Sequence, residues 1–103
     1  HLTMTKKSYR IEEIFQLEGG DIVIGLVASN AIERDEWQKR SIKGLKSDFE
    51  NRSFQVINHD FKSSILAVDI ISSIANFKNV FLRVKNSDKA LKLKLKDEIE
   101  IIQ

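Results

Sequence analysis

Hydrophobic and polar residues alternate over short stretches of this chain, a pattern typical of β-strands with one buried face. The clearest example is segment 8–30, where a strand over about 9–17 is followed by a second over about 21–28. Between them, Gly19 and Gly20 predict a tight turn, because glycine adopts positive φ at little cost. We therefore expect a β-hairpin at the start of the fold.

Both strands of this hairpin depart from simple alternation. Strict alternation would place Glu13 on the same face as Tyr9 and Ile11, and a β-bulge near Glu12 and Glu13 would restore the register. The second strand is apolar on both faces, which indicates a strand covered from both sides. Gly25 in its middle predicts a sharp bend or a close approach of another group to the backbone.

The next segments are less regular. Segment 30–40 is polar, with Ile32 and Trp37 as its apolar anchors, and fits either one helical turn or a loop. Segment 41–46 is interpreted as a short strand and 47–52 as a turn. Segment 53–62 alternates clearly and predicts a strand.

The last third contains one ambiguous and two regular segments. Segment 63–79 has apolar residues at both helical and strand spacing, but its β-branched content favours a strand followed by a loop or a short turn of helix. Segment 80–85 predicts a strand and 86–88 a turn. Segment 90–102 alternates most regularly of all and predicts a strand with one buried and one solvated face.

Short strands with little convincing helix predict an all-β protein. We expect a small closed or nearly closed antiparallel β-barrel of about six strands, formed as a single domain by residues 8–103. No internal repeat or linker suggests a second domain. The predicted core consists of Ile24, Leu26, Phe54, Val56, Leu82, Val84, Leu93 and Leu95.

Composition narrows the functional classes. Hydrophobic residues make up 42% and charged residues 31% of the 103 residues, as in ordinary globular proteins. No apolar run approaches the ~20 residues of a membrane helix and no signal peptide is recognisable, so we expect a cytoplasmic protein without membrane contact. Residues 1–3 precede Met4 and are interpreted as a cloning remnant, with 1–7 disordered and a natural protein of 100 residues.

The chain shows no catalytic or metal-binding signature, so we expect neither an enzyme nor a bound cofactor or metal. The absence of cysteine excludes disulfides and thiolate metal sites. His59 and Asp60 are adjacent, but no third member of a catalytic set is recognisable. Glu12 and Glu13 point to opposite faces of a strand and cannot share a proton.

A row of lysines is the most suggestive feature. On a strand, Lys92, Lys94 and Lys96 would project from one face at intervals of ~6.6–6.8 Å, close to the spacing of phosphates along a nucleic-acid strand. Arg83 and Lys85 would share a face of the neighbouring strand, and segment 78–103 carries seven Lys and Arg against four Asp and Glu. Phosphate contact is one interpretation, and an ordinary solvated face that prevents aggregation is the other.

Trp37 also allows two interpretations. In its polar segment the indole ring would be able to stack on a base. Alternatively, it packs into the core and anchors the segment.

Two segments carry a resemblance to a known family. YRIEEIFQLEGGDIVIGLVASNAIERDE (9–36) and NVFLRVK (79–85) resemble the second domain of translational GTPases such as elongation factor Tu. Ile14-Phe15 occupies the place of the family's Val-Phe-like pair, whereas Ala31 and Arg34 replace glycines of its pattern. The resemblance implies a β-barrel that contacts aminoacyl-tRNA or the ribosome. It does not extend to nucleotide binding, because the chain has no GxxxxGK[ST] loop.

Two functions from different classes follow. The first is a non-catalytic barrel that binds structured RNA, the ribosome or a translation-associated protein. The second is a protein–protein interaction module, such as an immunity or regulatory protein, with no nucleic-acid role. Salt-dependent RNA binding would favour the first, and a stable stoichiometric protein partner without RNA would favour the second.

Overall fold

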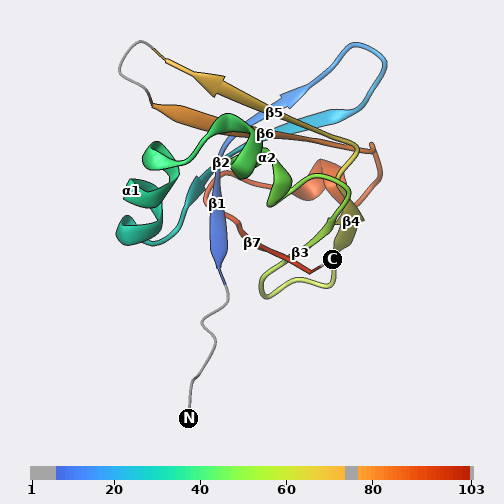
Figure 1. The fold of residues 1–103 in the computed structure, drawn as a ribbon. Helices are drawn as coiled ribbons and strands as arrows, with labels where there is room; N and C mark the ends of the chain where they lie inside the picture. The colour runs from blue at the N-terminus through green and yellow to red at the C-terminus, as the bar shows by residue number, and fades with distance from the viewer. Residues whose placement is uncertain (1–6, 74–76, 103) are drawn as a thin grey trace.

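The computed structural model describes residues 7–73 and 77–102, and within these ranges seven antiparallel strands form one sheet (Figure 1). The order of the strands across the sheet is β4-β3-β7-β1-β2-β6-β5. In chain order they are β1 (Ser8–Gln16), β2 (Ile22–Ala28), β3 (Ser53–Val56), β4 (Lys62–Ser64), β5 (Ala67–Ser72), β6 (Lys78–Val84) and β7 (Glu98–Ile101). The helical elements are α1 (Ala31–Lys39), α2 (Ile42–Ser47) and the 3-10 helix η1 (Ala90–Lys92).

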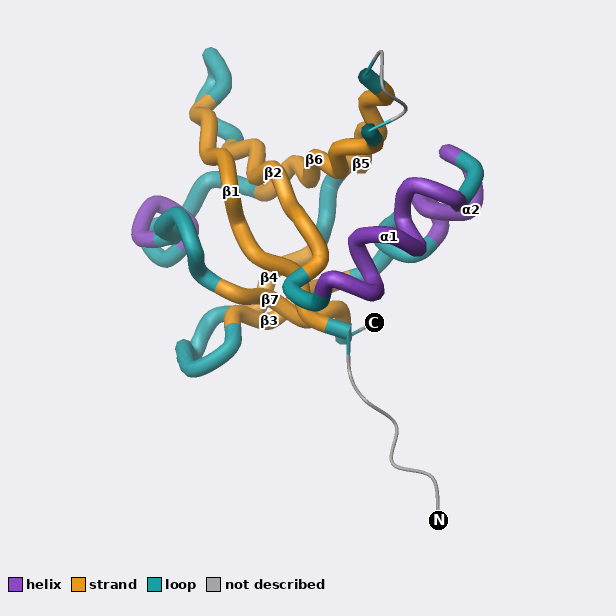
Figure 2. The backbone as a smooth tube through the Cα atoms, turned by 90° about the vertical axis from the view of Figure 1, so that its left-hand side faces the viewer, coloured by secondary structure: helices purple, strands orange, loops and turns teal. Residues whose placement is uncertain are grey.

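The sheet is strongly curved but open. In Figure 2, β1 curves from the group formed by β2, β6 and β5 to the group formed by β7, β3 and β4. Within the described residues, the edge strands β4 and β5 pair with β3 and β6 and not with each other. The predicted all-β antiparallel fold is confirmed in part, because strands predominate but two α-helices are present. The expected closed or nearly closed barrel of about six strands is found as an open sheet of seven.

The two edges nevertheless meet at one corner of the sheet. Only Ile65 and Leu66 separate β4 from β5 in the chain. The Ile65 amide donates to the Arg52 carbonyl just before β3, and the Leu66 amide donates to the Arg83 carbonyl on β6, both at 2.9 Å. These two bonds satisfy the backbone of the corner and tie it to both halves of the sheet.

The β1–β2 hairpin forms as its sequence predicts. Its register shifts between Ile11 and Glu13, so Glu12 is the extra residue of the expected bulge. In the turn, Gly19 and Gly20 have φ angles of 99° and 108°, a region that favours glycine. The amide of Leu17 donates to the carbonyl of Asp21 at 2.7 Å and closes the hairpin.

The close approach predicted at Gly25 is also present. Gly25 pairs with Glu13 on one side and with Phe81 on the other. A Cβ atom at this position would lie 2.9 Å from Cε1 of Phe81 and 3.2 Å from Cβ of Glu13. The ring of Phe81 therefore occupies the space that any larger residue at position 25 would need.

Helix α2 replaces the strand that we predicted for 41–46, and the nine-residue helix α1 replaces the loop or single helical turn expected for 30–40. Side chains cap both N-termini: Asn30 accepts from the amides of Ile32 (2.8 Å) and Glu33 (3.3 Å), and Ser41 accepts from the amide of Gly44 (3.0 Å). These caps favour helix over strand at the points where the chain leaves β2 and α1.

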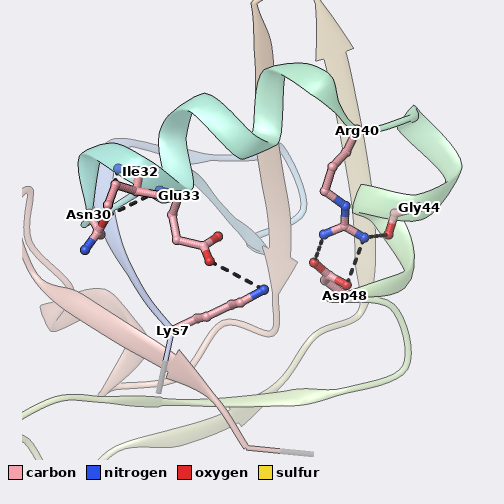
Figure 3. A network of polar contacts seen from close by, with 7 residues as sticks. All are labelled: Lys7, Asn30, Ile32, Glu33, Arg40, Gly44 and Asp48. Carbon is pink, nitrogen blue, oxygen red and sulfur yellow. Dashed lines mark hydrogen bonds and ion pairs between the residues drawn. The ribbon is translucent and has the colours of Figure 1, made fainter. Parts of the chain in front are cut away.

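An arginine joins the two helices (Figure 3). The guanidinium of Arg40 donates to both carboxylate oxygens of Asp48 and, at 2.8 Å, to the carbonyl of Gly44. Lys7, which we expected to be disordered, is described and lies 3.5 Å from the carboxylate of Glu33 on α1. Residues 1–6, the rest of that predicted disordered segment, lie outside the described residues.

An aromatic cluster attaches helix α1 to the sheet. The ring of Trp37 stacks on Tyr9 at 5.6 Å and meets Phe49 edge-on at 6.1 Å. Tyr9 and Phe49 meet edge-on at 5.0 Å. Trp37 is only 2% exposed, so it is a core anchor, and its ring is not available for the base stacking considered above.

Burial in this cluster changes the ionisation of Tyr9, the only tyrosine of the chain. Desolvation, followed by the negative charges of Asp48 and Glu33, raises the pKa of Tyr9 to about 12. Because the folded-state pKa exceeds the unfolded value of about 10, the stability contributed by the neutral phenol is complete below about pH 10. It is lost as the pH rises through about 12.

We therefore expect the phenolate absorbance of the folded protein to rise near pH 12. Tyr9→Phe should make the free energy of unfolding less sensitive to pH between about 10 and 12 than in the wild type. An absorbance titration and urea denaturation at several pH values measure the two quantities. A midpoint near pH 10 in the folded protein would contradict the buried environment described here.

The segments from β3 to β6 follow the sequence pattern with one interruption. The strand predicted over 53–62 is divided by a turn, in which Asn58 has a φ of 68°, into β3 and the start of β4. Within 63–79, the strand interpretation is confirmed over β5 (67–72). Residues 74–76 of the predicted loop or helical turn lie outside the described residues.

The strand predicted over 90–102 is wrong for most of its length. Only 98–101 form a strand, β7, while 90–92 form η1 and Lys96 adopts a φ of 77° in the turn that follows. Two local hydrogen bonds stabilise this path: the Ala90 amide donates to Oγ of Ser87 (3.0 Å), and the Lys94 amide donates to Oδ2 of Asp97 (2.9 Å). Such side-chain bonds compete with strand formation.

The set of buried core residues is close to the predicted set. Seven of the eight predicted core residues are buried, but Leu95 is 56% exposed because it lies in the turn before β7. Strand β7 lies in the interior of the sheet, where it pairs with β1 on one side and β3 on the other. Among the described residues, no helix has the length and apolar character needed to cross a membrane.

Candidate nucleic-acid interface

Two neighbouring hollows, of about 560 and 1050 Å³, lie beside the turn between β3 and β4. Asp60, Phe61 and Lys89 line both, so the hollows adjoin one another, and we call them together the lysine groove. Its first hollow lies toward η1, and its second lies toward the segment after β6. The groove gathers several of the predicted site residues.

Five lysines line the lysine groove: four lie within residues 85–94, and Lys62 comes from a distant segment. Lys62 begins β4, and Lys85 follows directly after β6. Lys89 precedes η1, Lys92 ends it, and Lys94 lies between η1 and β7. The fold thus concentrates positive charge that the sequence distributes over more than thirty positions.

Three of the five cations predicted as phosphate contacts reach the groove, namely Lys85, Lys92 and Lys94. They do not form the evenly spaced row that we expected, because 90–97 is not a strand. Arg83 and Lys85 do not face that segment across a ladder either, since the partners of β6 are β2 and β5.

The other two predicted cations are already paired with carboxylates. Nε of Arg83 donates to Asp21 at 3.0 Å. Nζ of Lys96 donates to both carboxylate oxygens of Glu12 at 2.8 and 3.1 Å, and this hydrogen bond is the main cause of the lowered pKa of Glu12. The backbone of Lys96 also bonds to Ile11 at 2.7 Å, so this residue supports the bulge in β1.

Most of the groove lysines, in contrast, have free ammonium groups. Lys89 donates to the carbonyl of Asp60 at 2.8 Å and lies 3.8 Å from its carboxylate. Within residues 7–73 and 77–102, the ammonium groups of Lys62, Lys85, Lys92 and Lys94 make no ion pair. Four charges are therefore available to an anionic ligand.

The acidic residues of the groove do not cancel this charge. Asp60, Asp88 and Asp97 line it, against five lysines. The Asp97 carboxylate accepts the Lys94 amide and is committed to the turn before β7. The groove therefore has a net positive charge.

Five of the residues that line the groove are apolar, and we call them together its floor and the lysines its rim. Val56 and Leu93 are buried, and Phe61 is half-buried with its ring edge-on to Phe54 at 6.1 Å. Leu91 in the first hollow and Leu66 in the second are 54% and 51% exposed. A surface that combines free ammonium groups with apolar side chains can bind a ligand that is both anionic and partly hydrophobic.

His59 and Asp60, the adjacent pair considered for catalysis, lie in the exposed turn after β3 and not on a strand. In the part of the chain that the structure describes, no three His, Cys, Asp or Glu residues come together as metal ligands would.

Sequence reasoning missed Lys62, Lys89 and Phe61 as members of this surface. No spacing connects them, because they meet only through the turn after β3 and the packing of η1. The one local signal is the pair Phe61-Lys62 next to His59-Asp60, which places an aromatic ring beside charged groups in a turn.

Comparisons with known proteins do not identify a relative. No family model, no curated protein and no solved structure matches this chain.

Proposed function

We propose that this protein is a non-catalytic binding module that contacts RNA through the lysine groove. The observation that carries the proposal is the gathering of Lys62, Lys85, Lys92 and Lys94 around one concave surface, where none has a carboxylate partner among the described residues. A lysine ammonium is a compact point charge that contacts phosphate oxygens without demanding a fixed geometry.

The resemblance to the second domain of translational GTPases favours the same function, since that barrel contacts aminoacyl-tRNA or the ribosome. A module of this kind would keep an RNA-contacting surface without a nucleotide switch, and it would act in the cytoplasm. The residues compared with a turn of that family, around Ile32 and Asp35, form helix α1 here.

The test is RNA binding across a salt series. We expect the wild type to bind with a log–log salt slope of about −2 to −4, for three to five phosphate contacts at ~0.7–0.9 each. Replacing Lys85, Lys92 and Lys94 together by Gln should weaken binding at low salt and flatten the slope by about two to three.

A matched variant controls for the loss of net charge. Lys39, Lys43 and Lys46 lie on or beside α1 and α2, outside the residues that line the groove. Their triple replacement by Gln removes the same charge and should leave the slope nearly unchanged. The proposal fails if the wild type binds no RNA at low salt, or if both triple variants lose affinity equally.

One observation favours the second candidate function, a protein–protein interaction module. Phe15 on β1 is 50% exposed and its ring lies 6.5 Å from that of Phe81 on β6, and Ile71 on the edge strand β5 is 55% exposed. An exposed aromatic ring packed beside another ring can contribute to a protein-binding surface. Purification of a stoichiometric protein complex that survives nuclease treatment would favour this function over RNA binding.

A further inference from the structure

We propose that the ligand of the lysine groove is single-stranded RNA, with bases placed on the apolar floor and phosphates held by the lysines of the rim. This inference rests on the proposed function and makes it specific. It goes beyond the sequence-based expectation of structured RNA, which followed from a flat row of lysines that the fold does not contain.

The apolar floor is the first reason. A ligand that offers only phosphates would leave Phe61, Leu66 and Leu91 in water, although the fold places all three in the groove. An unpaired base has an apolar face, and stacking such faces on aromatic side chains is the usual way in which proteins bind single strands. A duplex keeps its bases stacked inside and cannot use such a floor.

The rigidity of the floor is the second reason. Phe61 is held by its edge-on contact with Phe54, which is fully buried. Leu91 lies on η1, whose backbone is fixed by the bonds from Leu91 and Ala90 to the carbonyl and hydroxyl of Ser87, both at 3.0 Å. The buried side chain of Ala90 anchors the same turn. Little conformational freedom is then lost when a base packs against these side chains.

The distribution of charge indicates the path of the strand. Lys92 and Lys94 line the first hollow, while Lys62 and Lys85 line the second. Phe61 lines both and therefore lies between the two pairs of cations. A single strand running from one hollow to the other would pass Phe61 with phosphates on each side.

The experiment compares a fluorescent ten-nucleotide oligouridine with an RNA duplex of the same length, at one low salt concentration. We expect the single strand to bind at least about tenfold more tightly. Phe61→Ala should weaken oligouridine binding by about 5- to 150-fold, the range for loss of one stacked base. It should leave the salt slope unchanged, because no charge is removed.

Two further variants make the outcome independent of folding. Phe61 is half-buried and its replacement by alanine is expected to lower stability, so Leu91→Ser, at an exposed position, provides a second test of the floor. It should also weaken oligouridine binding without changing the salt slope. Phe77→Ala changes a residue that is 60% exposed and does not line the groove, and it should have no effect.

The failures of the two proposals are distinguishable. If the duplex binds as tightly as the single strand or more tightly, and the lysine triple variant still flattens the salt slope, the single-strand inference is overturned. The proposed function is then left intact. Equally tight binding of polyglutamate would show that charge alone is recognised, and it would overturn the inference too. If neither the oligouridine nor the duplex binds, both the proposed function and the single-strand inference are overturned.

Discussion

Replacement of Trp37 by alanine should lower the free energy of unfolding by about 3–5 kcal/mol, the range for large aromatic residues in cores. Trp37 is the buried residue of α1 and stacks on Tyr9 of the central strand β1. The helix has nine residues and a mostly polar sequence, too short to be stable without this contact. We therefore expect α1 to detach from the sheet. Urea denaturation followed by circular dichroism measures the change, because the variant lacks the only tryptophan.

Ile32 provides the matched control on the same helix. Ile32 and Trp37 are both apolar anchors in the sequence pattern of segment 30–40, but in the structure Ile32 is 72% exposed. Ile32→Ala should therefore change the free energy of unfolding by no more than ~0.5 kcal/mol. Similar losses for the two variants would mean that α1 packs on the sheet through a different face.

Introducing valine at Gly25 should lower the free energy of unfolding by about 2–3 kcal/mol, although valine is normally favoured in strands. The cause is steric: the added side chain would meet the ring of Phe81 and Cβ of Glu13, at 2.9 and 3.2 Å from the new Cβ atom. Cβ of Glu13 is fixed by the ladder between β1 and β2, and the ring of Phe81 can make room only by turning about its side-chain bonds. Chemical denaturation of the variant and the wild type measures the difference.

A double-mutant cycle isolates this contact. Phe81→Ala removes the ring that covers Gly25, and the double variant should be more stable than the sum of the two single changes predicts, by at least ~1 kcal/mol. Additive effects would show that the cost of valine arises elsewhere, for example from Glu13.

The parts of the fold that the sequence predicted correctly depend on local chemistry. Gly19 and Gly20 specify a hairpin turn, and period-two alternation specifies β3 and β6. The errors arose where polar side chains bond to the nearby backbone. Ser41 starts a helix in place of a strand, and Asp97 closes a turn in the middle of the most regular alternating segment. Alternation of leucine and lysine is compatible with several backbone paths, and these bonds select one of them.

The candidate site was predictable only in part, for a different reason. Lys92 and Lys94 attracted attention through their density in the sequence, which is a local property. Whether a cation remains free depends on distant residues: Glu12 pairs with Lys96 across more than eighty positions, and Asp21 pairs with Arg83 across more than sixty. Composition cannot reveal such pairs, because they require the register of the sheet.

The interior position of β7 in the sheet affects the order in which the strands can pair during folding. Strand β7 provides the ladder between the β3–β4 pair and the β1–β2–β6–β5 group, yet it follows all of them in the chain. During synthesis on the ribosome, the β1–β2 hairpin can form early, but one side of β1 stays unpaired until residues 98–101 emerge. Joining strands so distant in the chain also carries a large loop-closure entropy, so this pairing is expected to come late and to limit the folding rate. Until then, residues 8–10 of β1, which pair with β7 in the folded chain, are open to pairing with other chains, and a nascent-chain chaperone would be most useful in that interval.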